Sequence, residues 1–233
     1  MLSKVKTERV SEQVINQIKK QIESKELKKG NKLPSERAMV SQAEVSRISI
    51  REALSYLSAF GIIEKKSDGH YVADDLSNVF AEPFSLVMQL EDVTFREVTK
   101  LRMVLELYTL QLAFENMDES MVQTLKDVFE KFQNSSDLDE FIRLDREFHT
   151  CITKAANSKL VLILLNSLSD SIKTFNIISR QRIFNDPSTR QELFDIHARI
   201  LRAFETKDLA EAEAALREHF VYVIEVYERN NES

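Results

Sequence analysis

Short apolar stripes alternate with polar positions through the first 75 residues, as they do in amphipathic helices. Apolar residues recur every three or four positions among charged ones in residues 7–24, which predicts a first helix. A second, short helix is expected to begin near Ser35. Ser46 is placed to N-cap a third, because its hydroxyl can accept a free backbone N–H. The buried face of that third helix is expected to consist of Ile50, Leu54 and Leu57.

A small β-hairpin is expected after these helices. Ile62-Ile63-Glu64 and His70-Tyr71-Val72 flank the lysines Lys65-Lys66 and a turn at 67–69, and such runs read as paired strands. Residues 76–82 are short and polar, and we expect them to form a linker.

The pattern after the linker is helical throughout. Apolar residues at helical spacing predict seven helices, at 83–90, 94–115, 118–134, 137–156, 160–182, 187–206 and 209–228. All three glycines fall in the first 70 residues, so the later chain has no glycine-rich phosphate loop. We therefore expect a mainly α protein: a helical module with a small β wing at 1–75, and an all-α bundle at 83–233.

Two arginines mark the third helix as a candidate DNA reader. Arg47 and Arg51 lie four residues apart near its start, on a different face from its apolar stripe. A helix with this arrangement suits the major groove, where guanidinium groups read guanine edges or clamp phosphates. An ordinary helical hairpin with solvated arginines is the alternative, and the attached β-hairpin favours DNA binding.

A dense set of motif residues covers this segment: Gly30, Leu33-Pro34-Ser35-Glu36-Arg37, Val45-Ser46-Arg47, Arg51-Glu52-Ala53-Leu54, Leu57, Gly61 and Gly69. Together they resemble the GntR family of bacterial winged helix-turn-helix repressors. The resemblance implies a double-stranded DNA operator as partner. It also implies DNA contacts from Arg37, Ser46, Arg47, Ser49, Arg51, Gly69 and His70. Glu44 and Ser67 depart from the family pattern, because glycine usually stands at both positions.

Charge and cysteine content narrow the picture further. The net charge is −6, but residues 1–75 carry 14 basic and 11 acidic residues, whereas the remainder carries 18 and 27. A basic module joined to an acidic one fits a DNA reader attached to a regulatory domain. The single cysteine, Cys151, excludes an intrachain disulfide and a cysteine-based metal cluster. We find no signal-peptide pattern or membrane-length apolar run and expect a cytoplasmic protein.

Four ionisable side chains are expected to face inward in the helical part. Asp145 and His149 share one apolar stripe of the helix at 137–156, and His197 and His219 each lie among apolar residues of the last two helices. Burying such groups is costly unless they are paired or bind something. Three imidazoles and one carboxylate form a normal ligand set for a divalent transition metal. A purely structural polar cluster is the alternative.

The pattern Asp145-x-x-x-His149, a distal His197 and His219 22 residues later resembles the FCD ligand-binding domain of the FadR subfamily of GntR repressors. The resemblance implies that these four residues bind a metal, with zinc as first choice and nickel or manganese as alternatives. It also implies an open coordination position for a carboxylate metabolite. Arg102 could hold that carboxylate as the effector-binding residue, or could form a buried or interfacial salt bridge.

These features predict a homodimeric transcriptional repressor whose affinity for a two-fold symmetric operator is controlled by a small organic acid. No catalytic residues are expected. Three alternatives stay open: a regulator that responds to the metal itself, a metalloenzyme that uses the three histidines and the aspartate, and a helical domain that only dimerises.

Overall fold

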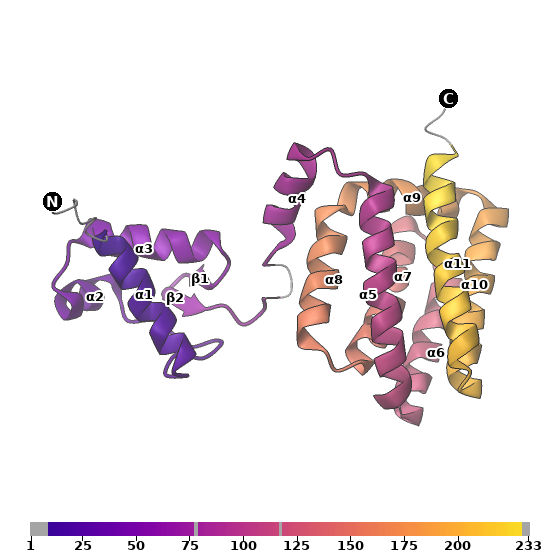
Figure 1. Ribbon diagram of the computed structural model, residues 1–233, viewed down its shortest axis with the longest axis horizontal. Helices are drawn as coiled ribbons and strands as arrows, with labels where there is room; N and C mark the ends of the chain where they lie inside the picture. The colour runs from indigo at the N-terminus through magenta and orange to yellow at the C-terminus, as the bar shows by residue number, and fades with distance from the viewer. Residues whose placement is uncertain (1–8, 77–78, 117, 230–233) are drawn as a thin grey trace, which may run out of the picture. The chain divides into compact units, whose positions relative to one another are not determined.

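The computed structural model describes residues 9–76, 79–116 and 118–229, and the chain divides into two compact units at residues 1–79 and 80–233 (Figure 1). Residues 7–8 of the expected first helix and 77–78 of the expected linker lie outside the described residues. Each unit is described by itself below.

Unit 1 is a three-helix module with a two-stranded antiparallel hairpin, as the sequence predicts. Ser35 Oγ accepts a hydrogen bond from the backbone N–H of Ala38 at 3.2 Å, and Ser46 Oγ accepts one from that of Ser49 at 3.1 Å. Both serines are therefore N-caps, which fixes where their helices begin. The elements are α1 (Val10–Glu23), α2 (Glu36–Ala43), α3 (Arg47–Ala59), β1 (Ile63–Lys66) and β2 (Gly69–Val72).

A small apolar core holds unit 1 together. The predicted face of α3 is buried against α1 and against the hairpin, whose register runs from Ile63 opposite Val72 to Lys66 opposite Gly69. Gly69 has a φ of +149°, a region that favours glycine, at the turn of the hairpin. Lys32 pairs with Tyr71 in an isolated bridge, which ties the segment before α2 to the hairpin. The buried α3 residues are Ile50, Ala53, Leu54 and Leu57.

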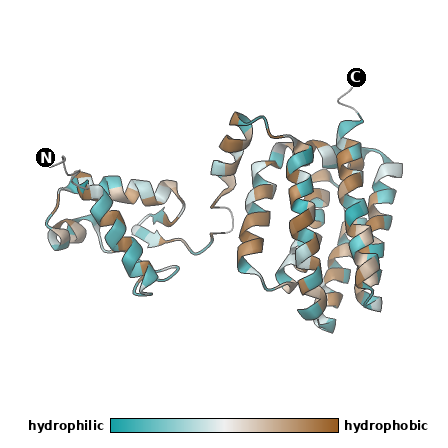
Figure 2. Cartoon of the chain, viewed as in Figure 1, coloured by the Kyte–Doolittle hydropathy of each residue, from teal (hydrophilic) through white to brown (hydrophobic). Residues whose placement is uncertain are grey.

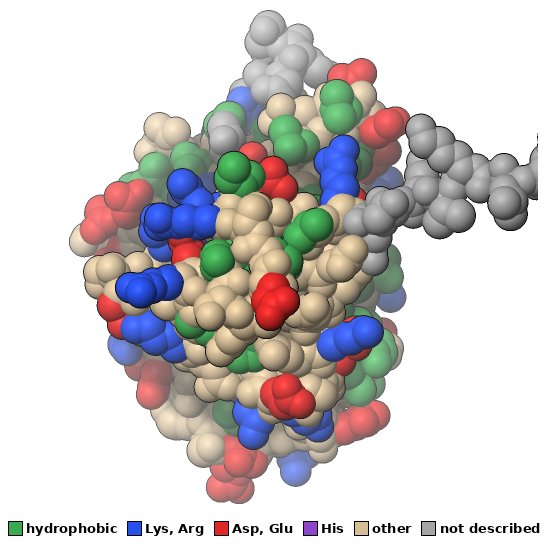
Figure 3. All heavy atoms as spheres, turned by 90° about the vertical axis from the view of Figure 1, so that its left-hand side faces the viewer, with side chains coloured by type: hydrophobic (Ala, Val, Ile, Leu, Met, Phe, Trp, Pro, Cys, Tyr) green, Lys and Arg blue, Asp and Glu red, His purple; other side chains and the backbone are tan. Residues whose placement is uncertain are grey.

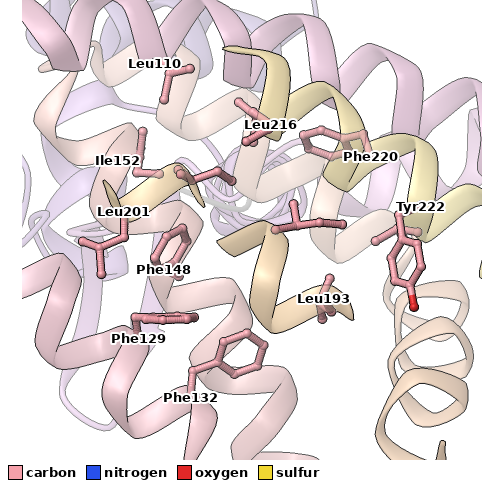
Figure 4. Close-up of a cluster of buried hydrophobic side chains, with 14 of the residues drawn as sticks. Leu110, Phe129, Phe132, Phe148, Ile152, Leu193, Leu201, Leu216, Phe220 and Tyr222 are labelled. Atoms are coloured by element: carbon pink, nitrogen blue, oxygen red, sulfur yellow. The ribbon is translucent and has the colours of Figure 1, made fainter. Parts of the chain in front are cut away.

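Unit 2 is a bundle of helices around one phenylalanine-rich core. Phe132, Phe141, Phe148 and Phe220 are among its largest fully buried side chains, and Figure 4 shows several core residues converging between helices. Figure 2 shows apolar and polar residues alternating along these helices. Its described helices are α4 (Ala81–Leu90), α5 (Phe95–Asn116), α6 (Glu119–Gln133), α7 (Leu138–Ala155), α8 (Lys159–Ser171), α9 (Lys173–Asn185), α10 (Pro187–Thr206) and α11 (Leu209–Glu228).

The single helix expected at 160–182 is wrong, because the chain bends by 77° there and forms α8 and α9. Buried Ile172 leaves helical geometry at the bend, with φ −108° and ψ 23°. Side chains add hydrogen bonds at the bend: Ser171 Oγ donates to Leu168 O at 2.8 Å, which also accepts the backbone N–H of Ile172, and Asn176 Nδ2 donates to Ser169 O at 3.2 Å. No single described helix has the length and apolar character to cross a membrane, although this bent pair meets both criteria together.

Candidate functional site

Three helices of unit 2 bring the four predicted metal ligands to one point. Asp145 and His149 come from α7, His197 from α10 and His219 from α11. One potential ligand atom from each lies within 4.8 Å of the others. The apolar stripe of each helix carries its ligand inward, because the same stripe packs into the core.

The cluster is buried and its donor atoms are largely unpaired. The exposed fractions of Asp145, His149, His197 and His219 are 4%, 6%, 0% and 1%. Among the described residues, Asp145 Oδ1, His197 Nε2 and His219 Nδ1 have no hydrogen-bond partner. Buried polar atoms normally have hydrogen-bond partners. Oxygen and nitrogen atoms that lack them and converge on one point therefore fit a bound cation. The residues present therefore suit a divalent transition metal.

Neighbouring groups orient two of the imidazoles. His197 Nδ1 lies 2.8 Å from Leu193 O, so this nitrogen donates its proton to the carbonyl and the lone pair is on Nε2. His149 Nδ1 lies 2.8 Å from Glu106 Oε2, an ion-pair distance without hydrogen-bond alignment. A carboxylate behind the distal nitrogen of a ligating histidine is a common arrangement at metal sites, because it fixes the ring and raises its basicity.

Arg180 of α9 is paired with the aspartate of the cluster. Its Nε and Nη2 both lie 2.8 Å from Asp145 Oδ2, and both side chains are buried. This contact leaves Asp145 Oδ1 free, 3.4 Å from His197 Nε2. Arg180 Nη1 is buried without a hydrogen-bond partner among the described residues.

Arg102, the predicted effector-binding residue, lies on α5 beside the cluster. Its Nη2 donates to Glu106 Oε1 at 2.9 Å, and both side chains are buried. Its Nε has no hydrogen-bond partner among the described residues. Arg102 therefore forms a buried salt bridge and also keeps a guanidinium N–H without a partner, which binding of an effector carboxylate would require.

The electrostatics of the cluster favour neutral imidazoles at His197 and His219 and a charged carboxylate at Asp145. Burial lowers the pKa of His197, and burial together with the other two imidazoles lowers that of His219 well below its usual range. Burial alone would raise the pKa of Asp145, but Arg180 and His197 hold it well below its usual range. Neutral imidazole and ionised carboxylate are the forms that bind metals.

A pocket opens beside the cluster, between α5, α7, α8 and α9. Its empty volume is about 950 Å³, part of it open to solvent. Asp145, His149 and Glu106 line it together with three arginines, Arg102, Arg146 and Arg180. A small anion in this pocket would meet the buried guanidinium groups of Arg102 and Arg180 and the candidate ligand atoms of Asp145 and His149.

The residues predicted to contact DNA lie on α2, on α3 and in the hairpin. Arg37, Arg47 and Arg51 are exposed, and Arg47 Nε donates to Glu36 at 3.2 Å. Ser46 and Ser49 are used within the helix cap, where their hydroxyls lie 2.9 Å apart. Figure 3 looks onto unit 1 and shows Lys and Arg side chains gathered along one edge, with apolar side chains exposed among them. Gly69 and His70 lie at the start of β2.

Sequence reasoning did not single out Glu106 or Arg180. Glu106 stands four residues after Arg102, a spacing at which helical side chains pair, so the sequence held a signal for that contact. Arg180 had none, because α8 and α9 were expected to be one straight helix.

Comparisons with known proteins agree with this arrangement. Residues 10–70 match the family described as "Bacterial regulatory proteins, gntR family", and residues 97–221 match the FCD domain. The HTH-type transcriptional regulator LutR of Bacillus subtilis is 31% identical, over 88% of this chain and 95% of that protein.

A second relative is the gluconate operon transcriptional repressor of Bacillus licheniformis, 28% identical over 75% of this chain and 67% of that protein. Among solved structures, Streptococcus agalactiae GntR has the same fold, with a TM-score of 0.67 at 23% identity, over 91% of this chain and 98% of that one. The chain therefore belongs to the GntR family of DNA-binding bacterial regulatory proteins, with a GntR-type helix-turn-helix domain followed by an FCD domain.

Proposed function

We propose that this protein is a transcriptional repressor of the FadR subfamily whose operator affinity is set by a small carboxylate bound at a metal site in unit 2. The observation that carries the proposal is the buried cluster of Asp145, His149, His197 and His219. Potential ligand atoms of these residues lie within 4.8 Å of one another, beside a pocket lined by three arginines. The protein acts in the cytoplasm, where its DNA is.

The metal is zinc in this proposal, with nickel and manganese as the other candidates. These four residues would hold a divalent ion, and a carboxylate oxygen would bind it as a further ligand beyond the four that the protein supplies. His197 offers Nε2, because Leu193 O holds its Nδ1 proton. Glu106 sets the ring of His149, and Arg180 sets the carboxylate of Asp145.

The effector is a small organic acid. Arg102 Nε and Arg180 Nη1 are the spare donors at this pocket, and a guanidinium matches a carboxylate in charge and shape. The name of one relative refers to a gluconate operon, and gluconate is a 2-hydroxy acid. Such acids are therefore the first probes to try.

The working unit is a homodimer on a two-fold symmetric operator. Leu101, Val104 and Tyr108 are large exposed apolar residues of α5, spaced so that they share one face. An exposed apolar helix face supports self-association. The ligand shifts the dimer between states of different operator affinity, because α7, α10 and α11 each contribute to its site.

Metal analysis and calorimetry test this proposal. Protein stripped with a chelator and reloaded is expected to hold one zinc per chain by mass spectrometry, and His219→Ala is expected to lose it. His70→Ala is the matched control, because His70 lies in the hairpin, and this variant retains the metal. Gluconate, lactate or glycolate is expected to release heat on binding to zinc-loaded protein only.

Two outcomes decide against parts of the proposal. A wild-type protein that binds no divalent metal contradicts the site. Operator affinity that follows the metal alone, with no effect of any of these acids, selects a metal-responsive regulator instead.

A further inference from the structure

One apolar side chain stands out on the surface of unit 1. Ile48 is 71% exposed, the largest exposed fraction of any large apolar side chain among the described residues of this unit. It lies in the first turn of α3, two residues after the capping Ser46. Isolated exposed apolar residues are common, so exposure alone assigns it no role.

Ile48 lies on the face of α3 that points away from the core of unit 1. An α-helix turns by 100° per residue, so Ile48 and Leu57, nine residues apart, lie on opposite sides of α3. Leu57 is buried in the core of unit 1, and Ile48 is therefore at the centre of the solvent face. Arg51 lies one turn further along that face and is exposed as well.

The chemistry of the major groove offers one partner for such a side chain. Base edges there present hydrogen-bonding groups except for the 5-methyl group of thymine, which is apolar. Arg47 and Arg51, on the same early turns of α3, would bring this face against phosphates and guanine edges.

We propose that Ile48 reads sequence, by packing against the 5-methyl group of one thymine in each half of the operator. The inference rests on membership of the DNA-binding family and is independent of the metal site. It makes Ile48 a specificity-determining residue of the DNA half of the protein.

Removal of single methyl groups tests this contact. The probe is a DNA duplex selected from a random pool by the wild-type protein, with each thymine replaced in turn by deoxyuridine. At one thymine per half-site, the replacement is expected to weaken wild-type binding by about fourfold, the factor that corresponds to burial of one methyl group. Ile48→Val is expected to keep this sensitivity, whereas Ile48→Ser loses it and binds the thymine and deoxyuridine duplexes equally.

Val10→Ala is the matched control, because Val10 is an exposed β-branched residue on α1. It is expected to behave as wild type. All variants should keep the wild-type melting temperature, since surface positions tolerate such changes. The proposal is overturned if the selected half-site contains no thymine, if no thymine is sensitive to loss of its methyl group, or if Ile48→Ser retains the sensitivity.

Discussion

Single residues of unit 2 place charge inside an apolar core, and each charge there has an identifiable counterpart. Asp145 faces Arg180, and Glu106 faces Arg102 and His149. Burial alone would raise the pKa of Glu106, but His149 and Arg102 lower it on balance. Because such a pair is costly to break from one side only, its members should depend on one another.

Asp145→Ala is expected to destabilise the metal-free protein by about 3–5 kcal/mol, because it leaves the buried guanidinium of Arg180 without its counter-charge. The measurement is the free energy of unfolding in urea with a chelator present. Asp170→Ala is the control. Asp170 pairs with the half-exposed Arg146, so its loss should cost less than about 1 kcal/mol.

A double variant, Asp145→Ala with Arg180→Met, should be less destabilised than the sum of the two single variants, because neither charge is then left alone. Strict additivity would mean that the two side chains do not interact.

The stability of the metal-free protein should fall as the pH drops below 6.5. His197 and His219 have folded-state pKa values below their usual 6.5, so the unfolded chain takes up protons there while the folded chain does not. Their contribution is present above pH 6.5 and is lost as the pH falls toward the folded-state values. The expected loss between pH 6.5 and 5.5 is about 1–2 kcal/mol. Urea midpoints measured in a chelator at both pH values check this, and an unchanged unfolding free energy would contradict it.

The four clustered residues could be predicted from sequence because each stands on an apolar stripe of a helix, where a charged or imidazole group needs a partner. Their convergence on one point depends on how α7, α10 and α11 pack. From the sequence, that packing could be expected only through the family resemblance. Arg180 could not be predicted at all. Its position depends on the bend at Ile172, which no glycine or proline marks.

Among the helices, α7 carries two of the four candidate ligands, whereas α10 and α11 carry one each. Its start is fixed by Asp137, whose side chain accepts the backbone N–H of Glu140 at 2.8 Å. This cap lies two turns before Asp145. Loss of the cap should therefore weaken the first turn of α7 and leave Asp145 and His149 in place.

Asp137→Ala is expected to lower the unfolding free energy by about 1 kcal/mol. Asp137→Asn should leave it nearly unchanged, because asparagine caps helices as well as aspartate does. Both variants should still bind zinc at one ion per chain. A cap variant that loses the metal would show that the start of α7 and the cluster are coupled more tightly than the hydrogen bonds imply.

Helix boundaries elsewhere followed from local signals. Ser35, Ser46 and Asp208 each cap the helix that the sequence predicted, and Pro187 begins α10. These signals are short-range contacts between a side chain and the next turn, so they can be read without knowing the fold. The break between α8 and α9 is instead made by packing, since buried Ile172 lies where the helix bends.

For the whole molecule, the proposed regulation requires that DNA binding in one unit and acid binding in the other share one equilibrium. Family membership assigns DNA binding to the GntR-type domain in unit 1, and the proposed metal and acid bind in unit 2. An acid can change operator affinity only by as much as its own affinity differs between the DNA-bound and free forms. Coupling in such systems is typically about 1–3 kcal/mol, or roughly 5- to 150-fold in affinity.

The most direct test is operator affinity measured by fluorescence anisotropy, with zinc-loaded and chelator-treated protein, in the presence and absence of a 2-hydroxy acid. We expect at least one such acid to weaken operator binding by roughly fivefold or more in the zinc-loaded protein, and to have no effect on chelated protein or on His219→Ala. Operator affinity that is indifferent to both metal and acid would contradict the proposed regulation.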